Sequence, residues 1–307
     1  MPQFKESYLE RYKILLGDEL EIFKEAILKP LPISIRVNTI KISKEAFLKR
    51  AEERKWKLQQ VPFFEDGFIF KERVYALGNT LEHFLGYIYM QEVASMIPPI
   101  VLNPNENESV LDMAAAPGSK TTQMAAMMNN KGIILANEKQ RDRLPALRMN
   151  LQRCGVINTA ICHKDGINLS KMELQFDKIL LDAPCSGTGA IMKSPSTLNT
   201  WSERTSINMS TIQKGLIKSA YQILKPRGVL VYSTCSLEPE EDELVIDYAV
   251  NKFGFKVEKF DLKDFKLREG INFWNGKELN PEVKNSKRVY PQDNGTEGFF
   301  IAKLRKM

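Results

Sequence analysis

Two cysteines stand at positions that suit thiol chemistry. Cys185 lies in LLDAPCSGTG (180–189), and Cys235 lies in VYSTCSLEPEE (231–241). Each follows an apolar run predicted to form a strand and precedes a predicted helix start, a setting that favours the reactive thiolate. Adjacent parallel strands lie about 5 Å apart, so thiols at neighbouring strand ends can meet over one substrate. Either cysteine alone is most simply an inert core residue, but the pair favours a reaction site.

A ligand-binding corner is predicted in VLDMAAAPGSKTT (110–122). The sequence indicates an apolar strand, a turn of small residues and a helix that begins near Lys120. Ligands of open α/β sheets bind where strands end and helices begin, and small residues let the backbone approach them closely. The turn contains only one glycine, Gly118, so neither the dinucleotide nor the P-loop glycine spacing is present. A nucleotide triphosphatase is therefore disfavoured, although any α/β protein needs small residues in such a turn.

Acidic residues recur at the carboxyl ends of four successive predicted strands. They are Asp112, Glu138, Asp165 and Asp182. One such acid is commonplace in a solvated loop, but four in register favour an adenosyl-type ligand, because a carboxylate in this position commonly binds ribose hydroxyls. Since no phosphate-binding glycine set is present, S-adenosylmethionine fits better than NAD.

Strands and helices alternate regularly after residue 105, which predicts an α/β fold of Rossmann-like type with a mostly parallel seven-stranded sheet. The acidic run at 238–243 is expected to decorate a helix start, where the helix dipole favours negative charge. The predicted strands lie near 109–113, 132–137, 158–162, 176–182, 228–234, 255–260 and 298–304. The predicted helices lie near 119–129, 140–153, 205–224 and 239–252.

The N-terminal part, residues 1–100, is predicted to be a small α/β accessory domain that precedes a catalytic domain at 101–307. Apolar residues at steps of three and four predict helices before residue 30, broken near Gly17. A strand is expected at 32–40. The remaining expectations are a helix at 44–55 with Ser43 as its cap, and a strand or hairpin at 63–73 around Asp66-Gly67.

Basic residues crowd the accessory domain and suggest that it holds RNA, although a solvated helix face balanced by glutamates explains them equally well. They are Arg36, Lys41, Lys44, Lys49, Arg50, Lys55 and Lys57. The net charge of +6 permits a polyanionic partner. No apolar run is long enough to span a membrane and no secretory signal is recognisable, which favours the cytoplasm. The four cysteines and two histidines lack zinc-like spacing, so no metal is expected.

Six segments together carry a family resemblance: RVNT (36–39), YMQEVASMIPP (89–99), DMAAAPGSKTT (112–122), LLDAPCSGTG (180–189), YSTCS (232–236) and RVYPQDNGTEGFF (288–300). From Ile33 to Lys306 the chain resembles the Nol1/Nop2/Sun family of RNA cytosine-5 methyltransferases, most closely its compact archaeal tRNA-type members. DAPCSG followed by STCS is highly specific. The chain departs from many relatives at Ala114, where they have Cys, and at Ser119, where Gly is frequent. No PUA-like insertion is recognisable.

The resemblance implies a role for each candidate catalytic residue. Cys235 would add to carbon 6 of cytosine, and Cys185 would assist release of the methylated product. Asp182 would bind the amidine edge of the base, and Lys120 would be a nearby cation that lowers a thiol pKa. The implied S-adenosylmethionine-binding residues are Ala114, Ala115, Ala116, Pro117, Gly118, Ser119, Lys120, Glu138, Arg143, Asp165 and Asp182.

Two alternatives stay open beside the RNA methyltransferase. A DNA cytosine-5 methyltransferase would use Cys185 as its nucleophile, but this leaves the motif at Cys235 unexplained, and no large target-recognition insertion is present. A non-catalytic RNA-binding or ribosome-assembly protein would not need both thiols and the whole set of cofactor residues. Small size and the resemblance favour tRNA as the substrate, with ribosomal RNA second.

Overall fold

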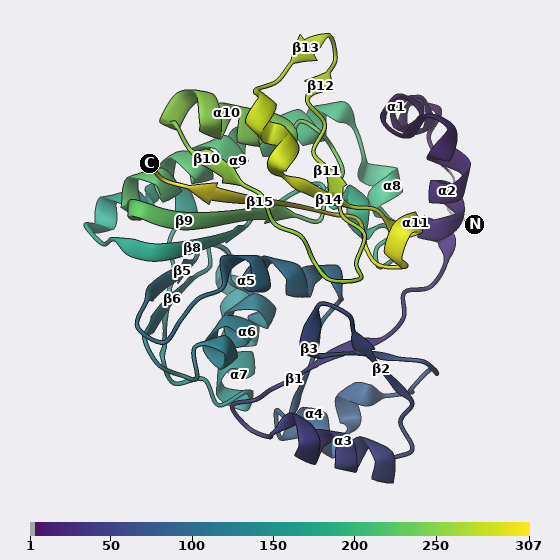
Figure 1. The fold of residues 1–307 in the computed structure, drawn as a ribbon, viewed down its shortest axis with the longest axis vertical. Helices are drawn as coiled ribbons and strands as arrows, with labels where there is room; N and C mark the ends of the chain where they lie inside the picture. Colours follow the sequence, from purple (N-terminus) through teal and green to yellow (C-terminus); the bar gives the residue numbers. More distant parts are fainter. Residues whose placement is uncertain (1–3) are drawn as a thin grey trace.

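The computed structural model describes residues 4–307, which fold around one large sheet and one small sheet (Figure 1). The large sheet has nine strands in the order β11-β14-β15-β9-β8-β5-β6-β7, and β10 also pairs with β15. Its strands are β5 (Ser109–Asp112), β6 (Ile133–Asn137), β7 (Thr159–Cys162), β8 (Phe176–Asp182), β9 (Leu224–Thr234), β10 (Lys256–Glu258), β11 (Arg268–Glu269), β14 (Lys287–Val289) and β15 (Phe299–Arg305).

The middle of the large sheet is parallel, as the alternation of strands and helices predicts. β7, β6, β5, β8 and β9 are parallel neighbours, and β15 returns antiparallel to β9. The predicted Rossmann-like α/β fold is therefore confirmed. The sheet exceeds the seven predicted strands because β11 and β14 add pairings of two and three residues, which are too short to produce a recognisable alternation.

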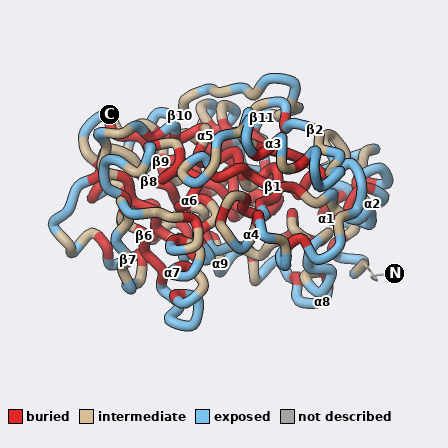
Figure 2. Tube along the Cα trace, turned by 90° about the horizontal axis from the view of Figure 1, so that it is seen from below, coloured by how far each residue is buried: buried red, intermediate tan, exposed pale blue. Residues whose placement is uncertain are grey.

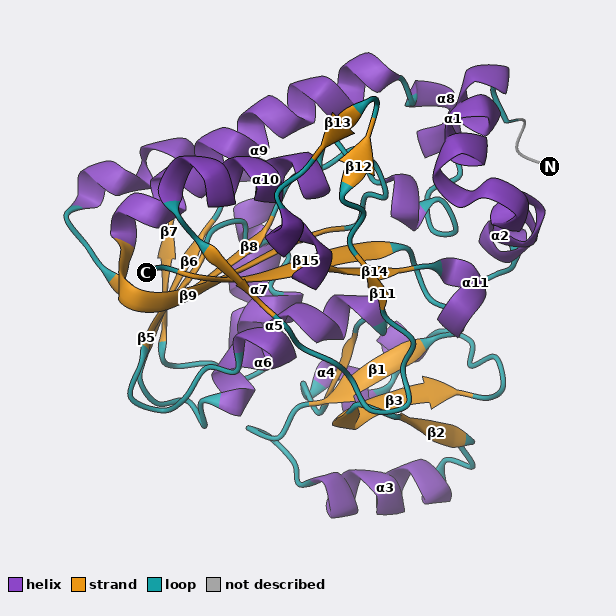
Figure 3. Cartoon of the chain, turned by 45° about the horizontal axis from the view of Figure 1, so that its top comes forward, coloured by secondary structure: helices purple, strands orange, loops and turns teal. Residues whose placement is uncertain are grey.

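Helices cover both faces of the large sheet (Figure 3). In β8, Leu180 packs toward α5 and α6, whereas the next residue, Leu181, packs toward α9 and α10. Burial on both faces explains the apolar run 179–181 within β8. Figure 2 shows this buried centre beneath exposed loops. The helices are α5 (Ile97–Leu102), α6 (Ser119–Met127) and α7 (Leu144–Arg153) on one face, and α9 (Glu203–Ile223) and α10 (Glu243–Phe253) on the other.

The small sheet is antiparallel, in the order β2-β3-β1-β4. Ser43 caps α3 as predicted, since its Oγ accepts a hydrogen bond from the Ala46 N–H at 3.2 Å. The hairpin alternative around Asp66-Gly67 is wrong, because both residues lie inside β3. Gly67 pairs with Arg36 of β1, and β2 and β3 shift register beside it. The elements are α3 (Lys44–Glu53), α4 (Leu81–Phe84), β1 (Ser34–Val37), β2 (Leu58–Val61), β3 (Phe64–Phe70) and β4 (Ile88–Met90).

The first two helices, α1 (Glu6–Leu16) and α2 (Leu20–Leu28), pack against the second half of the chain. The Tyr8 ring meets the Trp201 ring edge-on at 5.3 Å, and Arg11 Nε donates to Glu238 Oε2 at 2.6 Å. Figure 1 shows both helices beside α8 and α11. The remaining elements are α8 (Thr197–Thr200), α11 (Pro291–Asn294) and the hairpin β12 (Phe273–Trp274) and β13 (Lys277–Glu278).

Four of the seven basic residues that suggested an RNA-binding surface are buried or ion-paired. Arg36 is buried. The other three form ion pairs, Lys44 with Glu65 at 3.0 Å, Arg50 with Glu82 at 2.9 Å and Lys57 with Glu72 at 2.5 Å. Within residues 4–307, none of the helices combines the length and apolar character needed to cross a membrane.

Candidate active site

The turn between β5 and α6 forms one wall of a cavity of about 310 Å³. Gly118 has φ +105°, and a Cβ there would lie 3.1 Å from the Leu147 side chain, so this position favours glycine. Thr121 Oγ1 donates to Asp112 Oδ2 at 2.7 Å and holds the helix start on the end of β5. Burial, partly offset by that hydrogen bond, raises the pKa of Asp112 to about 7.

Three of the predicted strand-end acids line this cavity, namely Glu138, Asp165 and Asp182. Glu138 follows β6 and is almost fully buried, and its two oxygens accept hydrogen bonds from the backbone N–H of Ala116 at 3.2 Å and of Gln140 at 2.8 Å. Its carboxylate therefore fixes the turn as well as facing the cavity. The fourth acid, Asp112, is buried behind the turn.

Two cations flank the acids at the mouth of the cavity. Arg143 Nη1 lies 3.5 Å from Glu138 Oε2, and its Nη2 donates to the Ala116 carbonyl. Lys139 Nζ lies 2.7 Å from Asp165 Oδ2, and this hydrogen bond lowers the pKa of the Asp165 carboxyl. The predicted pair Glu138 and Arg143 is thus brought together around the small-residue turn.

The cysteines meet in another wall of the same cavity. Because β8 and β9 are parallel neighbours, with Asp182 opposite Ser233, the residues that follow both strands reach one place. Cys185 Sγ lies 3.3 Å from Cys235 Sγ. The hydrogen bond to Cys235 raises the pKa of the Cys185 thiol well above its usual value, and burial and Glu241 add to the shift. The Cys185 thiol therefore stays protonated.

Lys120 and Asp182 form an ion pair beside the thiols. Lys120 Nζ lies 2.7 Å from Asp182 Oδ2 and also donates to Ser95 Oγ at 2.9 Å, while Ser233 Oγ donates to Asp182 Oδ1 at 2.8 Å. Burial opposes the charged form of Lys120, but Asp182 outweighs it, so the pKa of Lys120 is raised and the ammonium persists. This fixed positive charge favours a nearby thiolate.

The predicted cofactor residues divide into two groups. Those that line the cavity are Ala114, Ala116, Glu138, Arg143, Asp165 and Asp182. Ala115, Pro117, Gly118, Ser119 and Lys120 shape the turn and the helix start but do not line it. Sequence reasoning missed Gly166 and the pair Ile212 and Leu216, which lie one turn apart on α9 and give the cavity its apolar side. Gly166 directly follows Asp165, so its position next to a predicted cofactor residue could have suggested it.

The acidic run after Cys235 lies at a helix start, as predicted, because α10 begins at Glu243, and most of the run is buried. Glu238, Glu241, Asp242 and Glu243 are fully buried. Glu241 accepts the Ser186 N–H at 2.8 Å and so ties the Cys185 loop to the Cys235 loop. The guanidinium groups that pair with this run come from distant segments, so nothing near it in the sequence indicated burial.

The profile of the family described as 16S rRNA methyltransferase RsmB/F matches residues 99–305, and that of the N-terminal domain of 16S rRNA methyltransferase RsmF matches residues 4–93. The chain belongs to the RsmB/F family. The predicted recognition as an S-adenosylmethionine-dependent enzyme of the RNA cytosine-5 methyltransferase family is thereby confirmed. Within residues 4–307, no group of three or more His, Cys, Asp or Glu side chains is arranged to hold a metal ion.

Relatives of this RsmB/F-family chain include tRNA (cytosine(49)-C(5))-methyltransferase of Pyrococcus abyssi, 46% identical over 97% of this chain and 95% of that protein. Ribosomal RNA small subunit methyltransferase F of Vibrio campbellii is 44% identical over 98% of this chain, which spans only 63% of that relative's length. A methyltransferase homolog from Pyrococcus horikoshii superimposes with a TM-score of 0.89 at 39% identity, covering 99% of this chain and 96% of that one. NSun6 from Pyrococcus horikoshii, solved with SFG, superimposes with a TM-score of 0.88 at 26% identity, covering 99% of this chain and 99% of that one.

Proposed function

We propose that this protein methylates carbon 5 of a cytosine in tRNA, with Cys235 as nucleophile and Cys185 assisting release. The observation that carries the proposal is the contact of 3.3 Å between the two thiols, in the wall of a cavity that three strand-end acids also line. When bound there, S-adenosylmethionine supplies an electrophilic methyl group.

The cavity suits an adenosyl ligand. Its turn presents only small side chains, Glu138 offers carboxylate oxygens for ribose hydroxyls, and Ile212 and Leu216 supply an apolar surface. We propose that the cofactor is held by the residues from Ala114 to Lys120 together with Glu138, Arg143, Asp165 and Asp182, and that those that do not line the cavity act by shaping the turn.

The contact between the two thiols supports different roles for them, with Cys235 attacking the base and Cys185 assisting its release. The Cys235 thiolate adds to carbon 6 of cytosine, which makes carbon 5 nucleophilic toward the methyl group. After methylation, the proton at carbon 5 must pass to a base, and the bond between carbon 6 and sulfur must break. Cys185, which stays protonated beside Cys235, can donate a hydrogen bond to the departing thiolate. Asp182, fixed by Lys120 and Ser233, faces the cavity and can bind the amidine edge of the base.

Removing the charge of Glu138 tests the cofactor site. Glu138→Gln should weaken binding of S-adenosylhomocysteine by about 2 kcal/mol, the scale of a charge-assisted hydrogen bond, or on the order of thirtyfold in Kd. Calorimetric titration measures this. Asp142→Asn removes an exposed carboxylate nearby and should leave the Kd unchanged. Wild-type affinity in Glu138→Gln would remove Glu138 from the cofactor site.

Substrate choice is tested with purified RNAs. The tRNA methyltransferase relative matches over 95% of its length, whereas the ribosomal RNA relative from Vibrio campbellii extends well beyond the match. We therefore expect tRNA transcripts to be methylated with a kcat/KM at least about tenfold above that of 16S ribosomal RNA, a difference of about 1.4 kcal/mol. Bisulfite mapping of both products locates the cytosine. Equal efficiency on ribosomal RNA would abolish the proposed preference, and higher efficiency would reverse it.

A further inference from the structure

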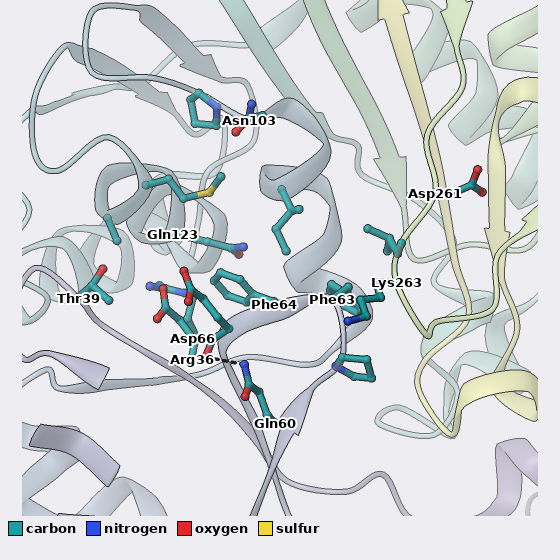
Figure 4. Close-up of a pocket in the computed structure, with 17 residues that line it drawn as sticks. Arg36, Thr39, Gln60, Phe63, Phe64, Asp66, Asn103, Gln123, Asp261 and Lys263 are labelled. Carbon is teal, nitrogen blue, oxygen red and sulfur yellow. Dashed lines mark hydrogen bonds between the residues drawn. The ribbon is translucent and has the colours of Figure 1, made fainter. Parts of the chain in front are cut away.

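A second and larger cavity, a cleft of about 750 Å³, lies between the small sheet and the large sheet. Its walls come from β1, from the β2–β3 hairpin, from α5 and α6, and from the segment at 261–263. Figure 4 shows Arg36, Gln60 and Asp66 grouped near Phe63 and Phe64, with Asp261 and Lys263 on a different segment. The catalytic cysteines do not line it, so the proposed chemistry leaves this cleft without a role.

The base of the cleft holds a guanidinium with unused hydrogen-bonding capacity. Arg36 is 1% exposed, and its Nε and Nη2 donate to Gln91 Oε1 at 3.1 Å and to Thr122 Oγ1 at 2.8 Å. Its Nη1 has no hydrogen-bond partner among the residues described. A buried, unpaired donor of this kind costs free energy, which an acceptor on a ligand would recover. Burial lowers the pKa of Arg36 to about 10, which still leaves it charged at neutral pH.

Asp66 supplies an acceptor in the same cleft. It is partly buried, and burial raises the pKa of its carboxyl, with Glu65 adding to the shift and Arg36 opposing it. Phe63 and Phe64 add aromatic surface. The cleft thus combines a donor, an acceptor and aromatic rings, the set by which proteins bind unstacked bases of single-stranded RNA.

The charges indicate a base rather than a phosphate. Glu65, Asp66 and Asp261 outnumber Arg36 and Lys263 among the lining residues, so a phosphate group would be repelled. Guanine matches best, because it presents the O6 and N7 acceptors on one edge and two neighbouring N–H donors on another. Adenine has a single exocyclic amino group and no N1 proton.

We propose that this cleft binds the base of one unpaired nucleotide of the RNA substrate, with Arg36 and Asp66 recognising a guanine and Phe63 and Phe64 contacting its rings. The proposal rests on the proposed function in taking RNA as the substrate. It also gives a role to the RVNT segment (36–39), because the proposed catalytic chemistry does not use that segment.

Hydrogen bonds connect the cleft to the reaction site. Gln91 accepts from Arg36 and donates to the Ser95 carbonyl at 3.1 Å, and Ser95 Oγ accepts from Lys120. Gln123, which lines the cleft, lies on α6 one turn after Lys120. A nucleotide held at Arg36 would therefore be fixed at a constant distance from Cys235, so the cleft would help to select which cytosine reaches the thiol.

Matched carboxylate-to-amide variants test the proposal. Asp66→Asn should weaken binding of a tRNA transcript by about tenfold, because a charged acceptor becomes a neutral one. Glu72→Gln removes an exposed carboxylate of the same sheet region and should leave the Kd unchanged or slightly lower it by reducing repulsion. Filter binding measures both. If the two variants bind the transcript equally, the cleft does not hold RNA through Asp66.

Nucleosides test the base without a phosphate group. With S-adenosylhomocysteine present at saturation, guanosine should bind the protein at least about tenfold more tightly than adenosine, and inorganic phosphate should not compete. Asp66→Asn should abolish this preference, and Cys235→Ala should keep it. Equal binding of guanosine and adenosine, or a preference retained in Asp66→Asn, would overturn the guanine assignment. Failure of the catalytic proposal appears separately, as absence of methyl transfer by a protein that still prefers guanosine.

Discussion

Cys235→Ala is expected to yield neither methylated RNA nor a covalent protein–RNA band, whereas Cys185→Ala is expected to accumulate that band. The reason is the different state of the two thiols across their contact of 3.3 Å. The raised pKa keeps the Cys185 thiol protonated, so the attack on carbon 6 is assigned to Cys235, the other sulfur of the pair, which lies near the Lys120 ammonium. The product rate of Cys235→Ala should fall at least about 10⁴-fold, the scale on which enzymes lose activity when a nucleophile is removed.

The step at which Cys185→Ala stalls is the informative one. Its Cys235 still attacks carbon 6 and the base still accepts the methyl group, but the departing thiolate loses its hydrogen-bond donor. The adduct should then survive denaturing electrophoresis and require S-adenosylmethionine for efficient trapping. Cys162→Ala provides a thiol control, because Cys162 ends β7 and does not line the cavity. It should form product at the wild-type rate.

A DNA-type mechanism gives the reverse pattern. Cys185 would then be the nucleophile, so Cys185→Ala would form no adduct and Cys235→Ala would retain one. Cofactor titration and a thermal unfolding curve for each variant show that the site and the fold persist. If Cys185→Ala gives no band while both measurements match the wild type, the assignment of the two thiols is wrong.

The sequence predicts the large sheet well because the relevant signals are local. The apolar run of β8 lies within a single strand, and the small-residue turn directly precedes α6, so each signal is contained in a short stretch of sequence. Once the strands are known to be parallel, their carboxyl ends must share an edge, and this places Glu138, Asp182 and both cysteines together. These parts of the site therefore follow from short-range patterns and one topological rule.

The features that sequence reasoning missed depend on long-range partners. Arg36 resembles one more basic surface residue, and only its contacts with Gln91 and Thr122 reveal that it is buried. In the same way, Glu238 is buried because Arg11 approaches from 227 positions earlier in the chain. Neither the periodicity nor the composition of either segment indicates a contact with such a distant residue.

Arg288→Met should lower the free energy of unfolding by about 3–5 kcal/mol, because it leaves buried carboxylates without their cation. Arg288 and Glu243 are both fully buried, and Arg288 Nε donates to Glu243 Oε1 at 2.6 Å. Asp242 lies 3.7 Å away, and its pKa is raised well above its usual value by burial, which Arg288 only partly offsets. Urea unfolding measures the change, and exposed Arg204→Met should cost less than about 0.5 kcal/mol.

The effect should also depend on pH. Without the guanidinium, the folded state must bind a proton at the buried Asp242 carboxyl that the unfolded state releases above about pH 4. When folding raises the pKa of a carboxyl, the free energy of unfolding of the protein falls as pH rises. The stability deficit of Arg288→Met should therefore be smaller at pH 5 than at pH 8. Arg288 Nη1 also donates to the Leu237 carbonyl at 3.0 Å, two residues after Cys235, so the same substitution should loosen the loop of the proposed nucleophile. A deficit below about 1 kcal/mol at both pH values would mean that these carboxylates do not depend on Arg288 for their burial.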